Sequence, residues 1–274
     1  MKTASQNHIS VVCPTYNSAL YIERTLESLF SQTVLPYEII FTDDGSEDST
    51  VEVLRSWETR FSGRSVKYSV LQNQHVGPGE NRNRGIAAAQ GSWVSFLDSD
   101  DYWQPAKIGH VYSVIEKNPR VNFVLHWEKY QKMDGEELVL KHGSVYDLNG
   151  SLGKQIYKNN SISTSAVTCK KEILESVGGF DKTLPVSQDY ELWLRLSPIM
   201  KPYVIEEILG CYTEQPNSIT ARPYRRRYFP LMRILFRHKD KGGIPCFFYR
   251  ALRASLSPQW GRDFLHWLKN EQRH

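Results

Sequence analysis

GSWVSFLDSDDYW, residues 91–103, joins an apolar run to three aspartates. Residues Trp93–Leu97 are typical of a buried strand, because four of the five are apolar. Asp98, Asp100 and Asp101 follow at once, and their like charges repel one another at this spacing. An exposed turn rich in aspartate is one explanation. A bound divalent cation is the sharper hypothesis, because hard cations prefer carboxylate oxygens.

The first hundred residues alternate between segments with strand character and segments with helix character. Short β-branched runs predict the strands, and apolar residues at helical spacing predict the helices. The strands are expected within residues 8–17, 37–50, 65–73 and 92–101, and the helices within residues 19–33, 46–61 and 79–90. This alternation is typical of a parallel α/β sheet. Ligands bind such sheets outside the carboxyl ends of the strands, so the polar loops there are expected to meet at one edge.

The second half of the chain is less regular. A plausible hairpin turn at residues 133–137 joins two of its expected strands. One helix is expected to stop at Gly178-Gly179, because glycine favours the chain reversal after a helix. The expected elements are strands within residues 122–131 and 137–148, a strand followed by a helix within 165–181, a helix within 187–197, and a strand within 201–214.

Four segments, taken together and in order, resemble the family 2 glycosyltransferases of the GT-A fold. They are VVCPTYN (11–17), TDDGSEDST (42–50), NRNRGIAAAQGSWVSFLDSDD (81–101) and GGFDKTLPVSQDYELWLRL (178–196). The resemblance covers roughly residues 8–215. It implies an α/β fold with a Rossmann-like, mostly parallel sheet flanked by helices. It also implies an inverting enzyme that moves a sugar from a nucleotide-sugar, usually a UDP-sugar, to a hydroxyl acceptor.

The same resemblance implies a reaction type and partners. The transferred group would be of hexosyl or N-acetylhexosaminyl type. The acceptor would be a saccharide or a lipid-linked sugar, as in the synthesis of bacterial cell-surface polysaccharide or glycolipid. Neither the sugar nor the linkage can be identified from the residues, because the loops that select them lie in the irregular half.

By this resemblance, Pro14, Tyr16 and Asp44 line the pocket for the nucleobase, with Asp43 beside them. A carboxylate there accepts the ring N–H of uracil, and Tyr16 offers an aromatic face for stacking. Arg82 matches a basic position that faces the nucleobase or the phosphates in relatives. Ordinary turn and cap chemistry also explains Asp43-Asp44, and an exposed helical arginine also explains Arg82.

Asp98-Ser99-Asp100 looks like the DxD motif of this fold, whose acids hold Mn²⁺ or Mg²⁺ through the donor phosphates. Asp100 matches the direct metal ligand. Asp98 matches a water-mediated metal ligand or a ribose contact, and Ser99 belongs to the nucleotide site. Asp101 is a helper without an assigned role. A metal ion would stabilise, as a Lewis acid, the charge that develops on the departing diphosphate.

Asp189 is the expected catalytic base. Inverting transfer needs one carboxylate that takes the proton of the acceptor hydroxyl. In the family this aspartate commonly follows a glutamate, ahead of a helix that carries Trp and Arg. Here Gln188 precedes Asp189, while Trp193 and Arg195 stand in the expected places. Asp189 could instead merely cap its helix, and Trp193 is expected in the core.

The chain divides by charge. Residues 222–274 hold 13 Lys and Arg against 3 Asp and Glu, whereas residues 1–221 hold 21 against 27. We therefore expect a catalytic domain, residues 1–220, and a basic, aromatic-rich helical extension, residues 221–274. The extension either lies on an anionic membrane surface or packs on the catalytic domain, and the sequence leaves both open. Nucleic acid is not an expected partner, because no nucleic-acid-binding module accompanies the charge.

Composition bounds the class of protein. The chain has 274 residues, of which 40% are hydrophobic, enough for a large core. No stretch reaches the roughly 18 apolar residues of a membrane span, and the first residues lack the apolar core of a signal peptide. A cytoplasmic location is therefore expected, with peripheral contact at the inner face of the membrane as an option. The four scattered cysteines predict neither a disulfide framework nor a zinc site.

Two other functions compete with sugar transfer. A nucleotidyltransferase of similar α/β build would also need metal-binding acids, but the loop after the first strand, residues 13–21, lacks the expected glycines and basic residues. A non-catalytic protein could keep a nucleotide-sugar pocket. The presence of both the Asp98-Ser99-Asp100 motif and Asp189 argues against that loss.

Overall fold

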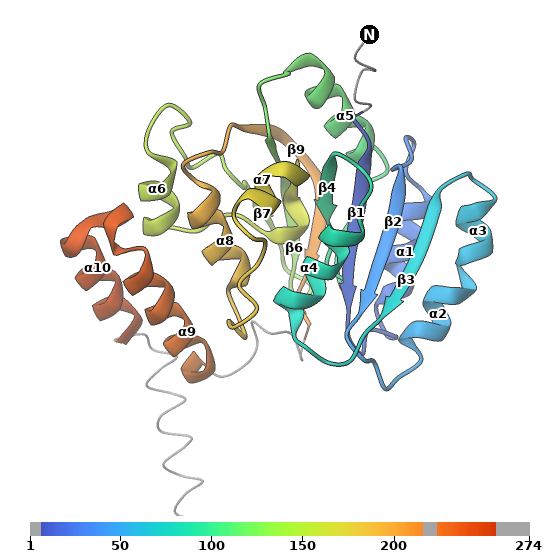
Figure 1. The fold of residues 1–274 in the computed structure, drawn as a ribbon, viewed down its shortest axis with the longest axis horizontal. Coiled ribbons are helices and arrows are strands. Elements are labelled where there is room, and N and C mark those ends of the chain that lie inside the picture. Colours follow the sequence, from blue (N-terminus) through green and yellow to red (C-terminus); the bar gives the residue numbers. More distant parts are fainter. Residues whose placement is uncertain (1–6, 216–223, 256–274) are drawn as a thin grey trace, which may run out of the picture.

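The computed structural model describes residues 7–215 and 224–255, which form one sheet with helices on both of its faces (Figure 1). The strands are β1 (Ile9–Thr15), β2 (Glu38–Asp43), β3 (Lys67–Gln72), β4 (Trp93–Phe96), β5 (Tyr102–Trp103), β6 (Phe123–Gln131), β7 (Glu137–Leu140), β8 (Val167–Lys170) and β9 (Pro202–Thr213). The helices are α1 (Ile22–Phe30), α2 (Thr50–Ser56), α3 (Glu58–Ser62), α4 (Pro78–Ala88), α5 (Lys107–Lys117), α6 (Leu152–Lys158), α7 (Lys171–Ser176), α8 (Gln188–Leu196), α9 (Tyr224–Arg237) and α10 (Lys239–Ser255).

The strand order is β3-β2-β1-β4-β8-β6-β9-β5, and β7 pairs with β6 outside this path. The first four strands are all parallel, which confirms the predicted parallel α/β half. Strand β8 then runs antiparallel between β4 and β6, and β6 pairs with β9 in parallel. Parallel pairs account for most of the paired residues, so the expected mostly parallel sheet is confirmed. The predicted hairpin of β6 and β7 is also present.

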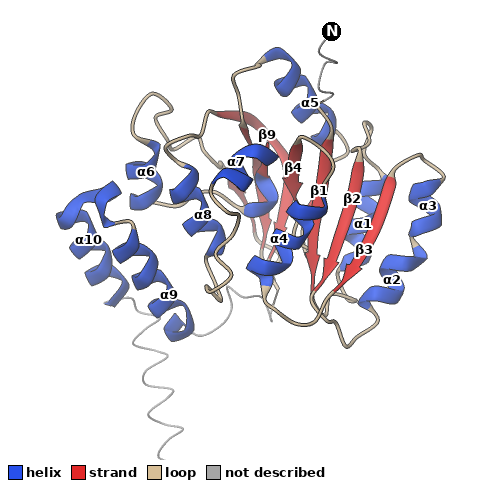
Figure 2. Ribbon diagram, in the orientation of Figure 1, coloured by secondary structure: helices blue, strands red, loops and turns tan. Residues whose placement is uncertain are grey.

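Two hydrophobic cores cover the two faces of the sheet, and Figure 2 shows helices on both sides of the sheet. Successive side chains of a strand point to opposite faces, and β1 follows this rule. Val12 packs in one core with Ile86 of α4, whereas Val11 and Cys13 pack in the other with Leu26 of α1. Helices therefore cover both faces, and the edge at the ends of the parallel strands is left for polar loops.

Helices α9 and α10 pack against the rest of the molecule through α6 and α8. The Tyr157 hydroxyl donates a hydrogen bond of 2.9 Å to the carbonyl of Leu235, which is fully buried. Arg237 Nη1 lies 2.7 Å from Asp181 and 3.0 Å from Glu191. Figure 1 shows these helices and α2–α3 at opposite ends of the long axis. The basic extension is thus helical where described; the boundary at residue 220 lies outside the described residues and stays a prediction.

Of the helices in residues 7–215 and 224–255, none combines the length and apolar character that crossing a bilayer requires. All four cysteines are free thiols.

The contact between α4 and β1 depends on Gly85. A Cβ there would overlap Cγ1 of Val12, which is completely buried. We expect Gly85→Ala to lower the free energy of unfolding by about 1–3 kcal/mol, because overpacking outweighs the roughly 1 kcal/mol that alanine gains over glycine within a helix. Urea unfolding measures this change.

Gly63→Ala is the matched control. It lies at the end of α3 with an ordinary φ of −61°, and a Cβ there would meet no atom closer than 3.5 Å. It should be as stable as the native protein or slightly more so. An unchanged stability in Gly85→Ala would mean that α4 can move away from β1 at little cost.

Candidate active site

The carboxyl ends of the parallel strands bring the predicted site together. Thr15 of β1 pairs with Asp43 of β2, which pairs with Gln72 of β3. Phe96, the last residue of β4, pairs with Val12 of β1. The loops that follow these strands therefore leave the sheet at one edge, as the strand–helix alternation predicted.

Tyr16, Asp44 and His75 form one end of this edge. Asp44 is buried, and its carboxylate accepts hydrogen bonds from the backbone N–H groups of Val76 at 2.8 Å and Gly77 at 2.9 Å. His75 Nδ1 lies 3.0 Å from the same carboxylate. The half-exposed ring of Tyr16 lies 4.6 Å from the His75 ring, between centroids. The arrangement fixes a carboxylate beside two aromatic faces.

Asp43 serves the loop itself. Its carboxylate accepts hydrogen bonds from the Thr15 hydroxyl at 3.0 Å and from the backbone N–H of Ser46 at 2.9 Å. Both predicted acids are thus buried, but Asp43 holds the turn while Asp44 reaches the segment at Val76. Pro14 is partly exposed near the end of β1.

Arg82 and Asp98 form an ion pair beside this edge. Arg82 Nη2 lies 2.6 Å from Asp98 Oδ1, and the arginine is buried. Burial lowers the pKa of Arg82, but the Asp98 carboxylate outweighs it, so the pKa is raised overall. The Nε atom of Arg82 is buried and finds no hydrogen-bond acceptor among the described residues. Such an unused donor suits a polar ligand.

The acidic loop is held by neighbouring hydroxyl groups. Ser99 Oγ lies 2.8 Å from Ser18 Oγ, which joins this loop to the one after β1. The backbone N–H of Asp98 donates to Ser165 Oγ at 3.0 Å, and Ser165 Oγ donates to Asp101 Oδ2 at 2.6 Å. Asp101 is therefore part of the scaffold that shapes the loop, which gives this residue a structural role.

Burial places the acids of this loop under electrostatic strain. Burial, and after it the neighbouring Asp98 carboxylate, raise the pKa of Asp100 to about 6. Burial also raises the pKa of Asp101 well above its ordinary value, with Asp100 adding to the effect. The positive charges near this loop therefore do not fully offset the burial of its carboxylates and their mutual repulsion.

Asp189 lies in the first turn of α8, after Ser187 in the left-handed region (φ 58°). Its carboxylate accepts the backbone N–H of Tyr190 at 2.7 Å, an N–H of the first turn of α8, whereas the N-cap residue Ser187 makes no side-chain cap hydrogen bond. Burial raises the pKa of Asp189, while Arg82 opposes this effect. Arg82 thus pairs with Asp98 and also interacts electrostatically with Asp189.

Comparison with known proteins identifies the family. The model of the family described as "Glycosyl transferase family 2" matches residues 10–171, more than half of the chain. The chain belongs to glycosyl transferase family 2. A glycosyltransferase of Haemophilus influenzae is 32% identical over 234 residues, which are 81% of this chain and 76% of that protein. A putative teichuronic acid biosynthesis glycosyltransferase of Bacillus subtilis, TuaG, is 26% identical over 79% of this chain and 83% of its own.

Solved structures share the fold of this family 2 glycosyltransferase. Residues 1–349 of TarS from S. aureus, in complex with UDP-GlcNAc, match with a TM-score of 0.69 at 19% identity, covering 92% of this chain and 73% of that one. The mannosyltransferase PcManGT of Pyrobaculum calidifontis, in complex with GDP-Man and Mn²⁺, matches with a TM-score of 0.65 at 17% identity, covering 94% and 74%. Three matched relatives from Rickettsia are much longer, and the match covers 29% to 33% of their length.

The acids of this family 2 enzyme suit a metal that the substrate helps to hold. Among residues 7–215 and 224–255, no three His, Cys, Asp or Glu side chains gather into a metal cage. Asp98 and Asp100 offer two carboxylates, one of them shared with Arg82. One or two carboxylates together with phosphate oxygens are the common ligand set of Mg²⁺. The strained Asp100 would also gain from a nearby cation.

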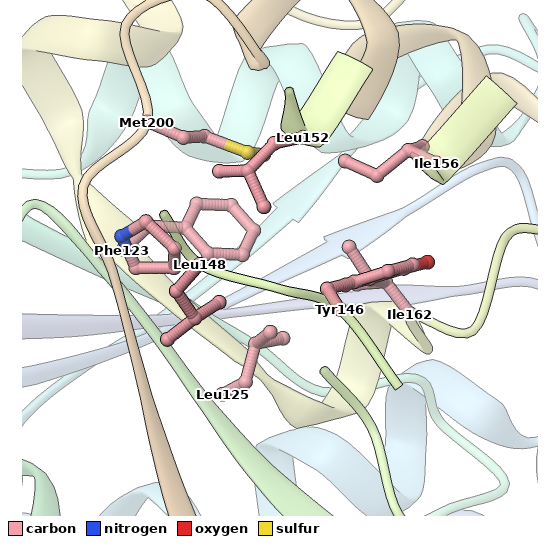
Figure 3. A pocket seen from close by; sticks show the side chains of 9 residues that line it. Phe123, Leu125, Tyr146, Leu148, Leu152, Ile156, Ile162 and Met200 are labelled. Atoms are coloured by element: carbon pink, nitrogen blue, oxygen red, sulfur yellow. The ribbon is translucent and has the colours of Figure 1, made fainter. Parts of the chain in front are cut away.

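An apolar pocket beside α6 plays no part in this site (Figure 3). Phe123, Leu125, Tyr146 and Leu152 are among its lining residues, and none of the predicted site residues is. A lining of this kind cannot pair with a diphosphate. We assign it to the packing of α6 against the sheet.

The sequence missed three supporting residues. His75 meets Asp44, and Ser165 connects Asp98 with Asp101. Arg24 of α1 donates through Nη2 to the carbonyl of Asp100 at 3.1 Å. Their positions in the sequence gave no signal, because each reaches the site from a different element. Gln188 is buried and donates to the Leu184 carbonyl at 2.8 Å, so the usual glutamate's position serves the scaffold here.

Proposed function

We propose that this enzyme transfers a sugar from a UDP-sugar to an acceptor hydroxyl, with inversion and with the help of Mn²⁺ or Mg²⁺. The observation that carries this proposal is the buried Arg82, which pairs with Asp98 at 2.6 Å and whose charge also acts on Asp189 and Asp100. One buried cation thus links the candidate donor-binding acids with the candidate base. Neither a turn rich in aspartate nor a helix cap would require that convergence.

Each residue has a separate task in the proposed reaction. Tyr16 and Asp44 bind the nucleobase, because they combine an aromatic face with a fixed acceptor. Arg82 orients Asp98 and offers its unused Nε–H to the donor. Asp98 and Asp100 would hold the metal, which supplies positive charge against the departing diphosphate when bound.

Asp189 performs the proton transfer. As the acceptor oxygen forms its bond to the anomeric carbon, the bond from that carbon to the diphosphate breaks, and Asp189 takes the hydroxyl proton. Attack from the side opposite the leaving group inverts the anomeric centre. Burial favours this role, because a raised pKa makes the carboxylate a stronger base.

We further propose an acceptor in cell-surface polysaccharide or glycolipid synthesis, either a saccharide or a lipid-linked sugar. The relative TuaG is named for teichuronic acid biosynthesis, and TarS was solved with UDP-GlcNAc. These names favour a hexosyl or N-acetylhexosaminyl group and UDP as the carrier. Pro14, Asp43 and Ser99 complete the proposed nucleotide site through the loops that they shape.

Calorimetric titration of the full chain with UDP tests the donor site. We expect binding in Mn²⁺ or Mg²⁺ and much weaker binding in EDTA. GDP is the informative alternative, because PcManGT was solved with GDP-Man. Metal-dependent binding of GDP rather than UDP would keep the reaction class and replace the donor. The absence of binding by UDP, GDP, dTDP and CMP would overturn the proposed function.

A further inference from the structure

Six large apolar side chains stand exposed on helices α9 and α10. Each of them is between 59% and 70% exposed. They are Phe229, Phe236, Ile244, Phe248, Tyr249 and Leu252. Single exposed apolar residues need no explanation, but a cluster of aromatic ones marks an interaction surface. We call this surface the α9–α10 face.

The spacing of these residues puts them on the outer side of the helices. Gly243, with φ 75°, interrupts α10, and a new helical run follows it. Ile244, Phe248 and Leu252 lie four residues apart in that run, so they share one stripe. Phe247 packs inward against the core, and Ala254 is buried. The second part of α10 therefore carries apolar residues on two sides, one packed inward and one exposed.

Ring contacts make the face continuous from α9 to α10. The Phe236 ring lies 6.2 Å from that of Phe247, and the Phe247 ring lies 5.4 Å from that of Phe248, between centroids. On α9, Phe229 and Phe236 are seven residues apart, so they lie along the same side of the helix. The exposed side chains of α9 and α10 therefore adjoin where Phe236 and Phe248 both contact Phe247.

The charge on this surface is mainly positive. Arg233, Lys239 and Arg253 are exposed beside the aromatic rings, and Lys239 Nζ lies 4.3 Å from the centre of the Phe236 ring. Asp240 is the one acidic residue in the sequence from 227 to 255. Aromatic residues among basic ones are typical of segments that lie at the surface of an anionic bilayer.

We propose that the α9–α10 face binds the surface of an anionic membrane, with its aromatic residues at the level of the lipid headgroups. A second copy of the chain is a poorer occupant, because a symmetric contact would bring Arg233, Lys239 and Arg253 against the same charges. Residues 256–274 carry three basic and two acidic side chains, so they bring no net negative charge to the face.

The α9–α10 face is tied to the active site. Arg237 of α9 pairs with Glu191 of α8, the helix whose first turn carries Asp189. Membrane binding would hold the active site at a fixed position relative to the bilayer. This consequence, a lipid-linked acceptor presented to Asp189, rests on the proposed function, whereas the membrane contact does not.

Co-sedimentation of the full chain with lipid vesicles tests the proposal without donor or acceptor. We expect binding to vesicles of phosphatidylcholine mixed with phosphatidylglycerol, and weak binding to phosphatidylcholine alone. High salt should weaken binding, because it screens surface charge. The double variant Phe248→Ser/Leu252→Ser should lower the partition coefficient at least about tenfold, since it removes apolar side chains from the bilayer.

Two further variants make the test specific. Leu138→Ser/Val139→Ser changes exposed apolar residues of β7 and should leave vesicle binding unchanged. Arg233→Gln/Arg253→Gln keeps the aromatic residues and should reduce binding to anionic vesicles only. Circular dichroism checks that each variant is folded.

Two results would overturn the proposal. One is undiminished vesicle binding by both the serine and the glutamine variants of the α9–α10 face, since lipid would then bind elsewhere. The other is that the native protein does not bind vesicles but forms a dimer, seen by light scattering, and that Phe248→Ser/Leu252→Ser dissociates this dimer. UDP titration of the same samples reports on the donor site separately, so failure of the proposed function would be distinguishable.

Discussion

Asp189→Asn is expected to reduce turnover by about 10²- to 10⁴-fold, the usual contribution of a general base. Asparagine keeps the size of the side chain and can still accept the Tyr190 N–H, but it cannot take a proton. The dissociation constant of UDP should change little, because Asp189 is not one of the residues proposed to bind the nucleotide. Release of UDP from the donor that calorimetry selects, with acceptor present, measures turnover.

Asp181→Asn is the control for this experiment. Asp181 precedes the same helix and pairs with Arg237, so the variant tests whether losing a nearby carboxylate is sufficient to impair turnover. It should lose some stability and keep its turnover. Near-native turnover in Asp189→Asn would contradict the assignment of Asp189 as the catalytic base.

The pH profile offers an independent test of the same assignment. A base acts when deprotonated, and burial raises the pKa of Asp189. Activity of the native enzyme should therefore fall on acidification at a higher pH than an ordinary aspartate would give. The residual activity of Asp189→Asn should lack this acid limb.

Asp100→Asn is expected to remove the metal dependence of donor binding. The amide lacks the negative charge that a divalent cation needs, and Asp98 is already engaged with Arg82. UDP affinity in Mn²⁺ should therefore fall to the native affinity measured in EDTA. The variant should be at least as stable as the native protein without metal, because burial and Asp98 disfavour the charged Asp100.

Tyr16→Ala distinguishes the contribution of the nucleobase contact to UDP binding from the contribution of the metal. Loss of stacking should weaken UDP binding by about 1–3 kcal/mol with metal and without it. Asp100→Asn should weaken UDP binding only when the metal is present. If Asp100→Asn kept its full affinity in Mn²⁺, the metal ligands would have to be other residues.

Local patterns were sufficient to predict the parallel half of the sheet. Apolar alternation and helical spacing act over a few residues, so β1 to β4 and the helices between them could be read directly. The antiparallel insertion of β8 between β4 and β6 could not, because pairing between distant segments leaves no local pattern. That insertion brings Ser165 to the acidic loop.

Lys107 illustrates the same limit. A lysine in a helix is usually solvated, yet Lys107 of α5 is completely buried. Its Nζ lies 3.5 Å from the centre of the Trp103 ring and donates to Thr168 Oγ1 at 3.1 Å. Burial lowers its pKa well below the ordinary value. Only the packing of α5 against the sheet decides this environment.

The sequence by itself determined the family, the α/β sheet and the acids at its edge, because short motifs and local periodicity encode them. The tertiary structure decided which groups meet: Arg82 with Asp98, and His75 with Asp44. It also decided that the basic helices pack inward while leaving the α9–α10 face exposed. Such contacts join residues far apart in the chain, and only the folded packing of the elements brings them within reach of one another.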